Sequence, residues 1–298
     1  MHRSFLGLSA AVVAAAVAVF PACGIHGPYN AEARDTWSRS YTLGQAGEIT
    51  IGNVNGRVIV EGVDGSTVQV DAERIAHAAT DQLARELLPR IPINDKSTPN
   101  MVQVETGRID GILIGASFEV RFHVKAPKGA TVRAATVNGG VEVQGLAGQT
   151  FARTTNGGVT AKDITGSLEA RTINGGIRAQ FGSLGTHDIV LNVVNGGIRV
   201  TLPESAKASI NATWVNGGIH TSGLNFDVRD SGKRHFEANL NGGGTHITAT
   251  VVNGGVTFGN GKDRDAEDIG DAIEKAVEGA VQKAVDKPAE KSKEHVAP

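Results

Sequence analysis

The chain is poor in cysteine, aromatic residues and net charge, and each shortage excludes a class of protein. Cys23 is the sole cysteine among 298 residues, so no disulfide forms within one chain. Aromatic residues make up 4%, which suits a narrow interior of small and β-branched side chains. The 29 Lys and Arg nearly balance the 31 Asp and Glu, so nothing favours a nucleic-acid partner.

Catalytic and cofactor motifs are also missing. The sequence has no histidine pair at metal-ligand spacing, no Gly-x-Ser-x-Gly and no Gly-rich loop ending in Gly-Lys-Ser/Thr. We therefore expect no metal site, no cofactor and no enzymatic activity.

The longest apolar run lies at the N-terminus. Residues 5–20 are uncharged and follow His2 and Arg3, which is typical of an export signal and short for a membrane span. We predict a signal peptide over residues 1–22 and a tether over 23–48. Cys23 follows a segment that resembles a bacterial lipobox, which predicts lipid attachment at Cys23. The alternative is cleavage after Ala33. Both predict export, to the bacterial cell envelope (periplasm or outer membrane) or to the medium.

Asn-Gly pairs recur through the rest of the chain. Between Asn138 and Asn216 they follow at spacings of 18, 18, 21 and 21 residues, and a period near 20 indicates a repeat architecture. Mostly apolar residues stand three and five positions after each Asn, and four and six before it. This alternation predicts a half-buried strand on each side of every Asn-Gly.

Two folds produce such strand pairs. Asn-Gly closes two-residue hairpins, or Asn-Gly-Gly forms the corner of a coil whose copies stack as a parallel β-helix. Hairpins need no match between repeats, whereas stacked coils require each column to keep its character. The columns are uniform, which favours an all-β parallel β-helix over residues 49–260, with coils of 18–21 residues.

Stacked corners predict a ladder of side-chain amides. Asn and Gly tolerate the left-handed backbone of a sharp turn, and stacked Asn side chains can hydrogen-bond to one another. Asn241 and residues 225–235 are assigned to a separate bend and a polar loop. We expect a structural role for the ladder residues, which are Asn55, Asn138, Asn156, Asn174, Asn195, Asn216 and Asn253.

Two segments have helical periodicity. Residues 75–88 share an apolar face and end at Pro89, which predicts an inserted helix. Within the C-terminal region, 261–298, residues 265–285 predict an amphipathic helix before a disordered tail. This helix either covers the open end of the solenoid or packs nearby, with membrane contact or self-association as alternatives.

Four arginines are expected to lie beside the corner if the coils stack in register. They form either a solvated surface or a basic strip for acidic glycans or lipid headgroups, and they are Arg153, Arg171, Arg178 and Arg199.

Three segments carry a family resemblance: residues 136–143 (TVNGGVEV), 170–177 (ARTINGGI) and 249–256 (ATVVNGGV). They resemble the DUF4097 family of bacterial "putative adhesins". Residues 122–130 (FHVKAPKGA) are similar to the strand and Pro-x-Gly turn that precede the first full repeat of that family. The resemblance covers residues 49–259. It implies a right-handed parallel β-solenoid in the cell envelope, and it supplies no catalytic or binding residues.

We therefore predict an exported, non-enzymatic β-solenoid that acts in adhesion or binds an envelope component, either glycan or protein. Two alternatives stay open. An end-to-end polymerising scaffold would need uncovered solenoid ends, and a polysaccharide-acting enzyme would need a groove with converging carboxylates. The sequence gives no oligomeric state.

Overall fold

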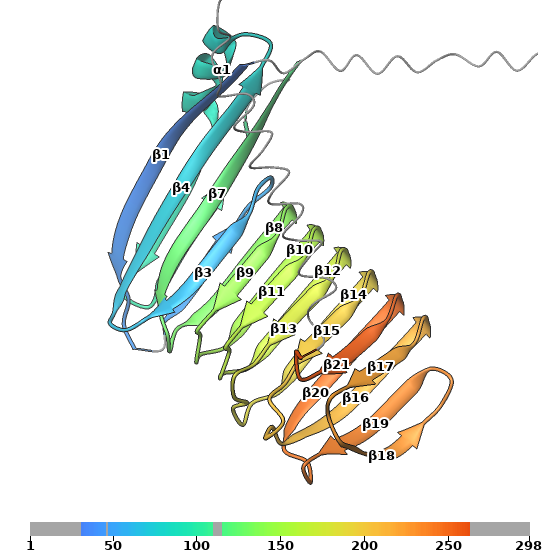
Figure 1. Ribbon diagram of the computed structural model, residues 1–298. Coiled ribbons are helices and arrows are strands. Elements are labelled where there is room, and N and C mark those ends of the chain that lie inside the picture. The colour runs from blue at the N-terminus through green and yellow to red at the C-terminus, as the bar shows by residue number, and fades with distance from the viewer. Residues whose placement is uncertain (1–30, 46, 110–114, 263–298) are drawn as a thin grey trace, which may run out of the picture.

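The computed structural model describes residues 31–45, 47–109 and 115–262, and most of these residues are in strands (Figure 1). The strands form two sheets. Sheet A contains, in spatial order, β1 (Ala31–Thr42), β4 (Thr67–Ala78), β7 (Ala116–Pro127), β3 (Val58–Val63), β9 (Val141–Gln144), β11 (Val159–Lys162), β13 (Ile177–Gln180), β15 (Ile198–Thr201), β21 (Val256–Gly259) and β17 (Ile219–Ser222).

Sheet B lies behind sheet A in Figure 1. It contains, in spatial order, β18 (Phe226–Ser231), β19 (His235–Leu240), β16 (Ala208–Asn216), β20 (Thr245–Asn253), β14 (Ile189–Asn195), β12 (Leu168–Asn174), β10 (Thr150–Asn156), β8 (Thr131–Asn138), β2 (Glu48–Gly52), β6 (Met101–Thr106) and β5 (Ile93–Thr98).

Each coil consists of a sheet B strand, a corner and a sheet A strand, and the corner is Asn-Gly-Gly in every coil except the first, where it is Asn-Gly-Arg. Neighbouring coils pair in parallel and in register, so that Ala152 faces Ala170 and Val159 faces Ile177. The chain rises through sheet B and descends through sheet A as it advances, which makes the solenoid right-handed (Figure 1). The predicted β-helix with stacked corners is therefore confirmed.

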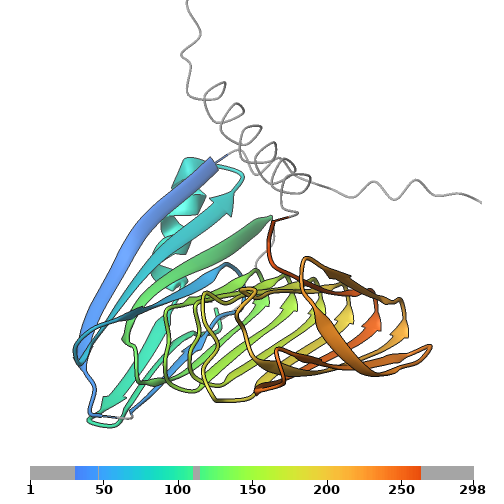
Figure 2. The same cartoon turned by 60° about the horizontal axis from the view of Figure 1, so that its bottom comes forward.

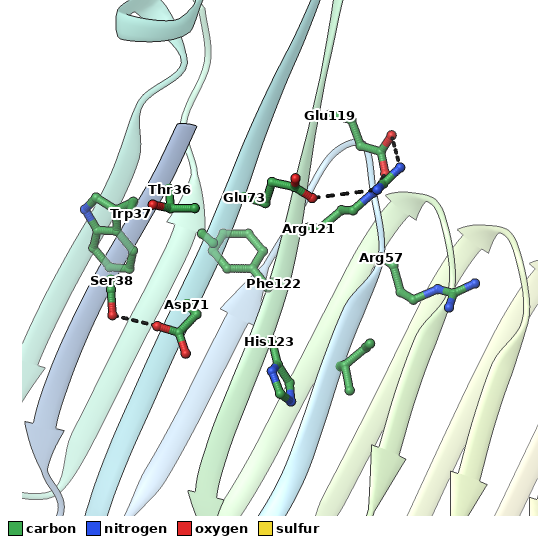
Figure 3. A pocket seen from close by; sticks show the side chains of 12 residues that line it. Thr36, Trp37, Ser38, Arg57, Asp71, Glu73, Glu119, Arg121, Phe122 and His123 are labelled. Atoms are coloured by element: carbon green, nitrogen blue, oxygen red, sulfur yellow. Dashed lines mark hydrogen bonds and ion pairs between the residues drawn. The ribbon is translucent and has the colours of Figure 1, made fainter. Parts of the chain in front are cut away.

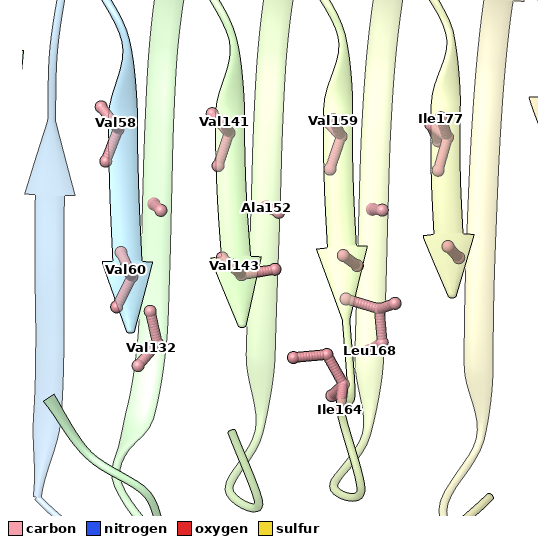
Figure 4. Close-up of a cluster of buried hydrophobic side chains, with 14 of the residues drawn as sticks. Val58, Val60, Val132, Val141, Val143, Ala152, Val159, Ile164, Leu168 and Ile177 are labelled. Carbon is pink, nitrogen blue, oxygen red and sulfur yellow. The ribbon is translucent and has the colours of Figure 1, made fainter. Parts of the chain in front are cut away.

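The core lies between the two sheets and is filled by short apolar side chains (Figure 4). Val141 and Val143 point inward from sheet A, and Val132 and Ala134 point inward from sheet B; all four are at most 1% exposed. Packed sheets lie about 10 Å apart, a gap that β-branched side chains and alanine fill without large aromatic rings. This geometry accounts for the low aromatic content.

The coils do not stack in chain order at the C-terminal end. The coil β20–β21 lies between β14–β15 and β16–β17, although it follows both in sequence. Figure 1 shows this as red-orange strands inside the amber ones. The segment between β16–β17 and β20 contains the antiparallel hairpin β18–β19, so the predicted polar loop at 225–235 is wrong. The separate bend at Asn241 is confirmed by its positive φ of 49°.

The N-terminal part differs from the prediction in two places. The predicted tether is wrong over Ala31–Thr42, because these residues form β1 and pair along their length with β4. The predicted helix begins too early, because β4 continues to Ala78. The helix α1 is Asp81–Leu87, capped by Thr80 and followed by the 3-10 turn η1, Leu88–Arg90. Figure 2 shows β1, β4 and β7 extending beyond the coils, with α1 beside β1 and β4.

The hairpin β18–β19 covers the last coil of sheet B. Phe226 packs edge-to-face on Phe236 and Phe258, with ring centroids 6.0 and 6.3 Å apart. Trp214 is 7% exposed and lies in the core. Four aromatic residues thus lie together near this end of the core, namely Trp214, Phe226, Phe236 and Phe258.

Candidate functional site: the Asn-Gly-Gly corner

The corner asparagines form the predicted ladder. Each Nδ2 donates to the Oδ1 of the neighbouring coil at 2.8–2.9 Å, in the order Asn55, Asn138, Asn156, Asn174, Asn195, Asn253, Asn216. The amides from Asn138 onward are exposed rather than buried. The ladder is therefore a surface feature as well as a corner support.

The two glycines of the corner have different environments. The first has a positive φ, 146° at Gly157, and a Cβ there would lie 2.0 Å from the carbonyl oxygen of Gly139. The second does not have a left-handed φ, and a Cβ there would lie 3.5 Å from its nearest neighbour at Gly140 and Gly255 but 3.2–3.3 Å from a carbonyl oxygen at Gly158, Gly176 and Gly197. The fold therefore requires the first glycine strictly and the second much less, since Gly140, Gly218 and Gly255 have room for a side chain.

The second glycine also leaves a backbone donor unused. In every coil that has this second glycine, its amide N–H donates to no acceptor within the described residues. The same position is glycine at Gly140, Gly158, Gly176, Gly197, Gly218 and Gly255, and arginine at Arg57.

Buried threonines support the first coils from inside. Thr136, Thr154 and Thr172 stand two positions before the Asn, and each donates its hydroxyl to a carbonyl of the preceding corner at 2.8–3.0 Å. In later coils valine or tryptophan takes this position. The threonines are thus part of the core.

A column of exposed apolar side chains runs beside the ladder. Eight large apolar side chains are exposed among the described residues, and six of them stand immediately before a corner Asn, at 36–48% exposure: Val54, Val137, Ile173, Val194, Val215 and Val252. In the remaining coil this position is occupied by Thr155. We call this column, the ladder and the two glycine columns together the corner strip.

The four predicted arginines flank the corner as two pairs instead of one strip. Arg153 and Arg171 project from sheet B, where both contact Glu169 at 2.6 and 3.0 Å. Arg178 and Arg199 are register partners on sheet A. The corner reverses the chain between the sheets, so outward side chains before and after it point to opposite faces. The prediction of a single basic strip is therefore wrong.

A groove of about 770 Å³ lies where the long N-terminal strands meet the first coil (Figure 3). Its acidic side chains are already bound: Asp71 accepts from Ser38 at 2.6 Å, and Glu119 accepts from Arg121 at 2.7 Å. That hydrogen bond raises the pKa of Arg121. The Arg57 side chain lines the groove and has no partner within the described residues. Arg57 and Glu119 also line a second hollow, which reaches the ladder at Asn55 and Asn138.

Sequence reasoning missed both the apolar column and the groove. The column was visible as a β-branched residue before nearly every Asn, but its exposure depends on the direction of the corner. The groove depends on β1 and β7, which lie far apart in sequence. No group of three metal-binding side chains occurs within the described ranges.

Four predictions lie outside the described residues, namely the signal peptide over 1–22, lipid attachment at Cys23, the C-terminal helix over 265–285 and the tail that follows it. Inside the described part of the chain, no helix is long and apolar enough to span a bilayer.

Comparisons with known proteins found a family profile and several solved structures that are similar to this chain. The sequence profile of DUF4097, described as Toastrack, matches residues 45–258. A "putative cell adhesion protein" from Clostridium sporogenes is 11% identical with a TM-score of 0.43, over 76% of this chain and 99% of that one. A "putative adhesin" from Bacteroides fragilis is 12% identical with a TM-score of 0.27, over 76% and 96%. No curated protein matches the chain.

Proposed function

This chain belongs to the Toastrack family, DUF4097, and we propose that it is a non-enzymatic, adhesin-like binding protein of the bacterial cell envelope. The corner strip carries the proposal. It exposes one set of groups in register across seven coils, six of them with an apolar side chain that the core does not use. Exposed apolar side chains that line up in this way, unlike those scattered singly, favour a binding surface.

The groove supports binding rather than catalysis. A carbohydrate-cleaving site needs two carboxyl groups that are free of other partners and can act on the substrate. Here Glu73 and Glu119 both contact Arg121, at 3.7 and 2.7 Å, and Asp71 accepts hydrogen bonds from Ser38 and Gln69. An end-to-end scaffold is disfavoured because the hairpin β18–β19 ends sheet B with antiparallel pairing.

Envelope binding is tested by sedimentation of the purified chain with isolated bacterial envelopes. We expect saturable binding by the folded chain. A variant with Arg153, Arg171, Arg178 and Arg199 all changed to Gln is compared with it. This variant should fold normally, because exposed substitutions usually change the free energy of unfolding by less than about 0.5 kcal/mol each. If binding is not saturable, the proposal is wrong. If the variant binds equally at all salt concentrations, the arginines take no part.

Export and anchoring through Cys23 form a separate prediction. A radiolabelled fatty acid should be incorporated into the wild-type chain expressed in bacteria and not into Cys23→Ser. A mature chain that begins at Arg34 would contradict lipid attachment and leave a secreted protein.

A further inference from the structure

We propose that the corner strip binds an uncharged, linear glycan that lies along the solenoid axis. This inference rests on the proposed binding function and names its ligand class. The strip follows the stacking direction across all seven coils, so a ligand with a repeating structure meets the same groups at each step.

The first argument is hydrogen-bonding capacity. A side-chain amide has two N–H donors and two acceptor lone pairs, and each internal ladder residue uses one donor and one acceptor on its neighbours. One donor and one lone pair per coil therefore remain for a ligand. The second-glycine N–H adds another donor. Sugar hydroxyls both donate and accept, so they match this mixed set.

The second argument is access. At Gly255 a Cβ would lie 3.5 Å from its nearest neighbour, so the fold would accept a side chain there. The glycine instead leaves the backbone bare beside the amides. Ligand atoms can approach the N–H groups directly, and the C–H faces of sugar rings can rest on the exposed β-branched column, represented by Ile173 at 46% exposure.

The third argument is size. Strands repeat at about 4.8 Å, so seven corners span about 29 Å, and the corner is roughly 10 Å wide because it joins two packed sheets. The resulting area of about 290 Å² is well below the ~800 Å² per partner of a stable protein interface. A second copy of the chain is too large for the strip alone, whereas an extended polymer fits it.

The fourth argument is charge. From Asn138 onward, the four columns of the strip contain only Val, Ile, Thr, Asn and Gly. The arginines lie outside the strip on its two flanks. Beyond Arg57 in the first coil, an anionic ligand would have no charged partner within the strip, so the strip favours a neutral one.

Titration with β-linked neutral di-, tetra- and hexasaccharides of glucose, N-acetylglucosamine and mannose tests the proposal. We expect affinity to rise with oligomer length and to be insensitive to salt. Ile173→Lys and Gly255→Leu should each weaken binding by at least about tenfold, the first by charge and the second by bulk. Leu83→Lys and Val228→Lys are matched controls, since these side chains are 51% and 50% exposed away from the strip. They should bind as the wild type does.

Circular dichroism confirms that each variant is folded before titration. If the wild type binds envelopes but none of the three hexasaccharides, or if the strip variants keep their affinity, the glycan inference is wrong and envelope binding stands. Salt-sensitive binding to polygalacturonate or phosphatidylglycerol vesicles alone would assign recognition to the arginine pairs and overturn it. If neither envelopes nor sugars bind, both proposals fail.

Discussion

At the residue scale, the two glycine positions of the corner carry the same residue but differ in backbone conformation and in the space available for a side chain. Gly157 is fixed by a φ of 146° and by the carbonyl of Gly139, whereas Gly140 has no left-handed φ and would hold a methyl group at an ordinary contact distance of 3.5 Å. The repeated Asn-Gly-Gly predicted a sharp corner, but only the backbone angles separate the glycine that makes the turn from the one that leaves a surface bare.

Substitution by alanine should separate these glycines. Gly157→Ala should lower the free energy of unfolding by about 3 kcal/mol or more, because it combines backbone strain with a backbone clash. Gly140→Ala should change it by less than about 1 kcal/mol. The shift of the denaturant midpoint at constant slope measures both. Equal shifts would mean that the second glycine is also required by the fold.

At the element scale, the antiparallel strands were the hardest to predict. β1 alternates small, polar and aromatic residues and carries no Asn-Gly, so nothing in its sequence ties it to the repeats. It is a strand because β4 pairs with it over twelve residues and because Arg74 binds Asp35 with two hydrogen bonds, at 2.6 and 2.7 Å. Ile75 had the right spacing for a helix but is buried in β4. In both places tertiary pairing overrode the local pattern.

The hairpin β18–β19 is expected to protect the end of the core. Phe236→Ala should cost about 3–5 kcal/mol, the usual range for a buried phenylalanine, and should expose the last coil to other chains. Phe151→Ala is the matched control, since Phe151 is only partly buried on the outside of sheet B, where Arg133 lies 4.0 Å from the ring centroid. Denaturant midpoints and size-exclusion chromatography test this. Equal losses from the two variants, or no aggregation of Phe236→Ala, would contradict the capping role.

At the scale of the whole molecule, the sequence predicted the coils but not their order. Every coil presents similar columns, so any coil can stack on any other, and column alignment carries no information about which ones are neighbours. The 37 residues from Asn216 to Asn253 were consistent with two consecutive coils. The hairpin between them instead carries the chain back, and Asn253 joins the ladder between Asn195 and Asn216.

Alanine substitutions along the ladder test that order. Asn253 donates to Asn195 and accepts from Asn216, both at 2.8 Å, whereas Asn216 is at the end and makes only one of these contacts. A hydrogen bond contributes about 0.5–1.5 kcal/mol, and these amides are exposed to water. Asn253→Ala should therefore cost about 1–2 kcal/mol and Asn216→Ala about half as much. Asn174→Ala and Asn55→Ala provide the internal and terminal references. If the coils stacked in chain order, Asn216 would be internal and the two costs would be reversed in denaturant melts.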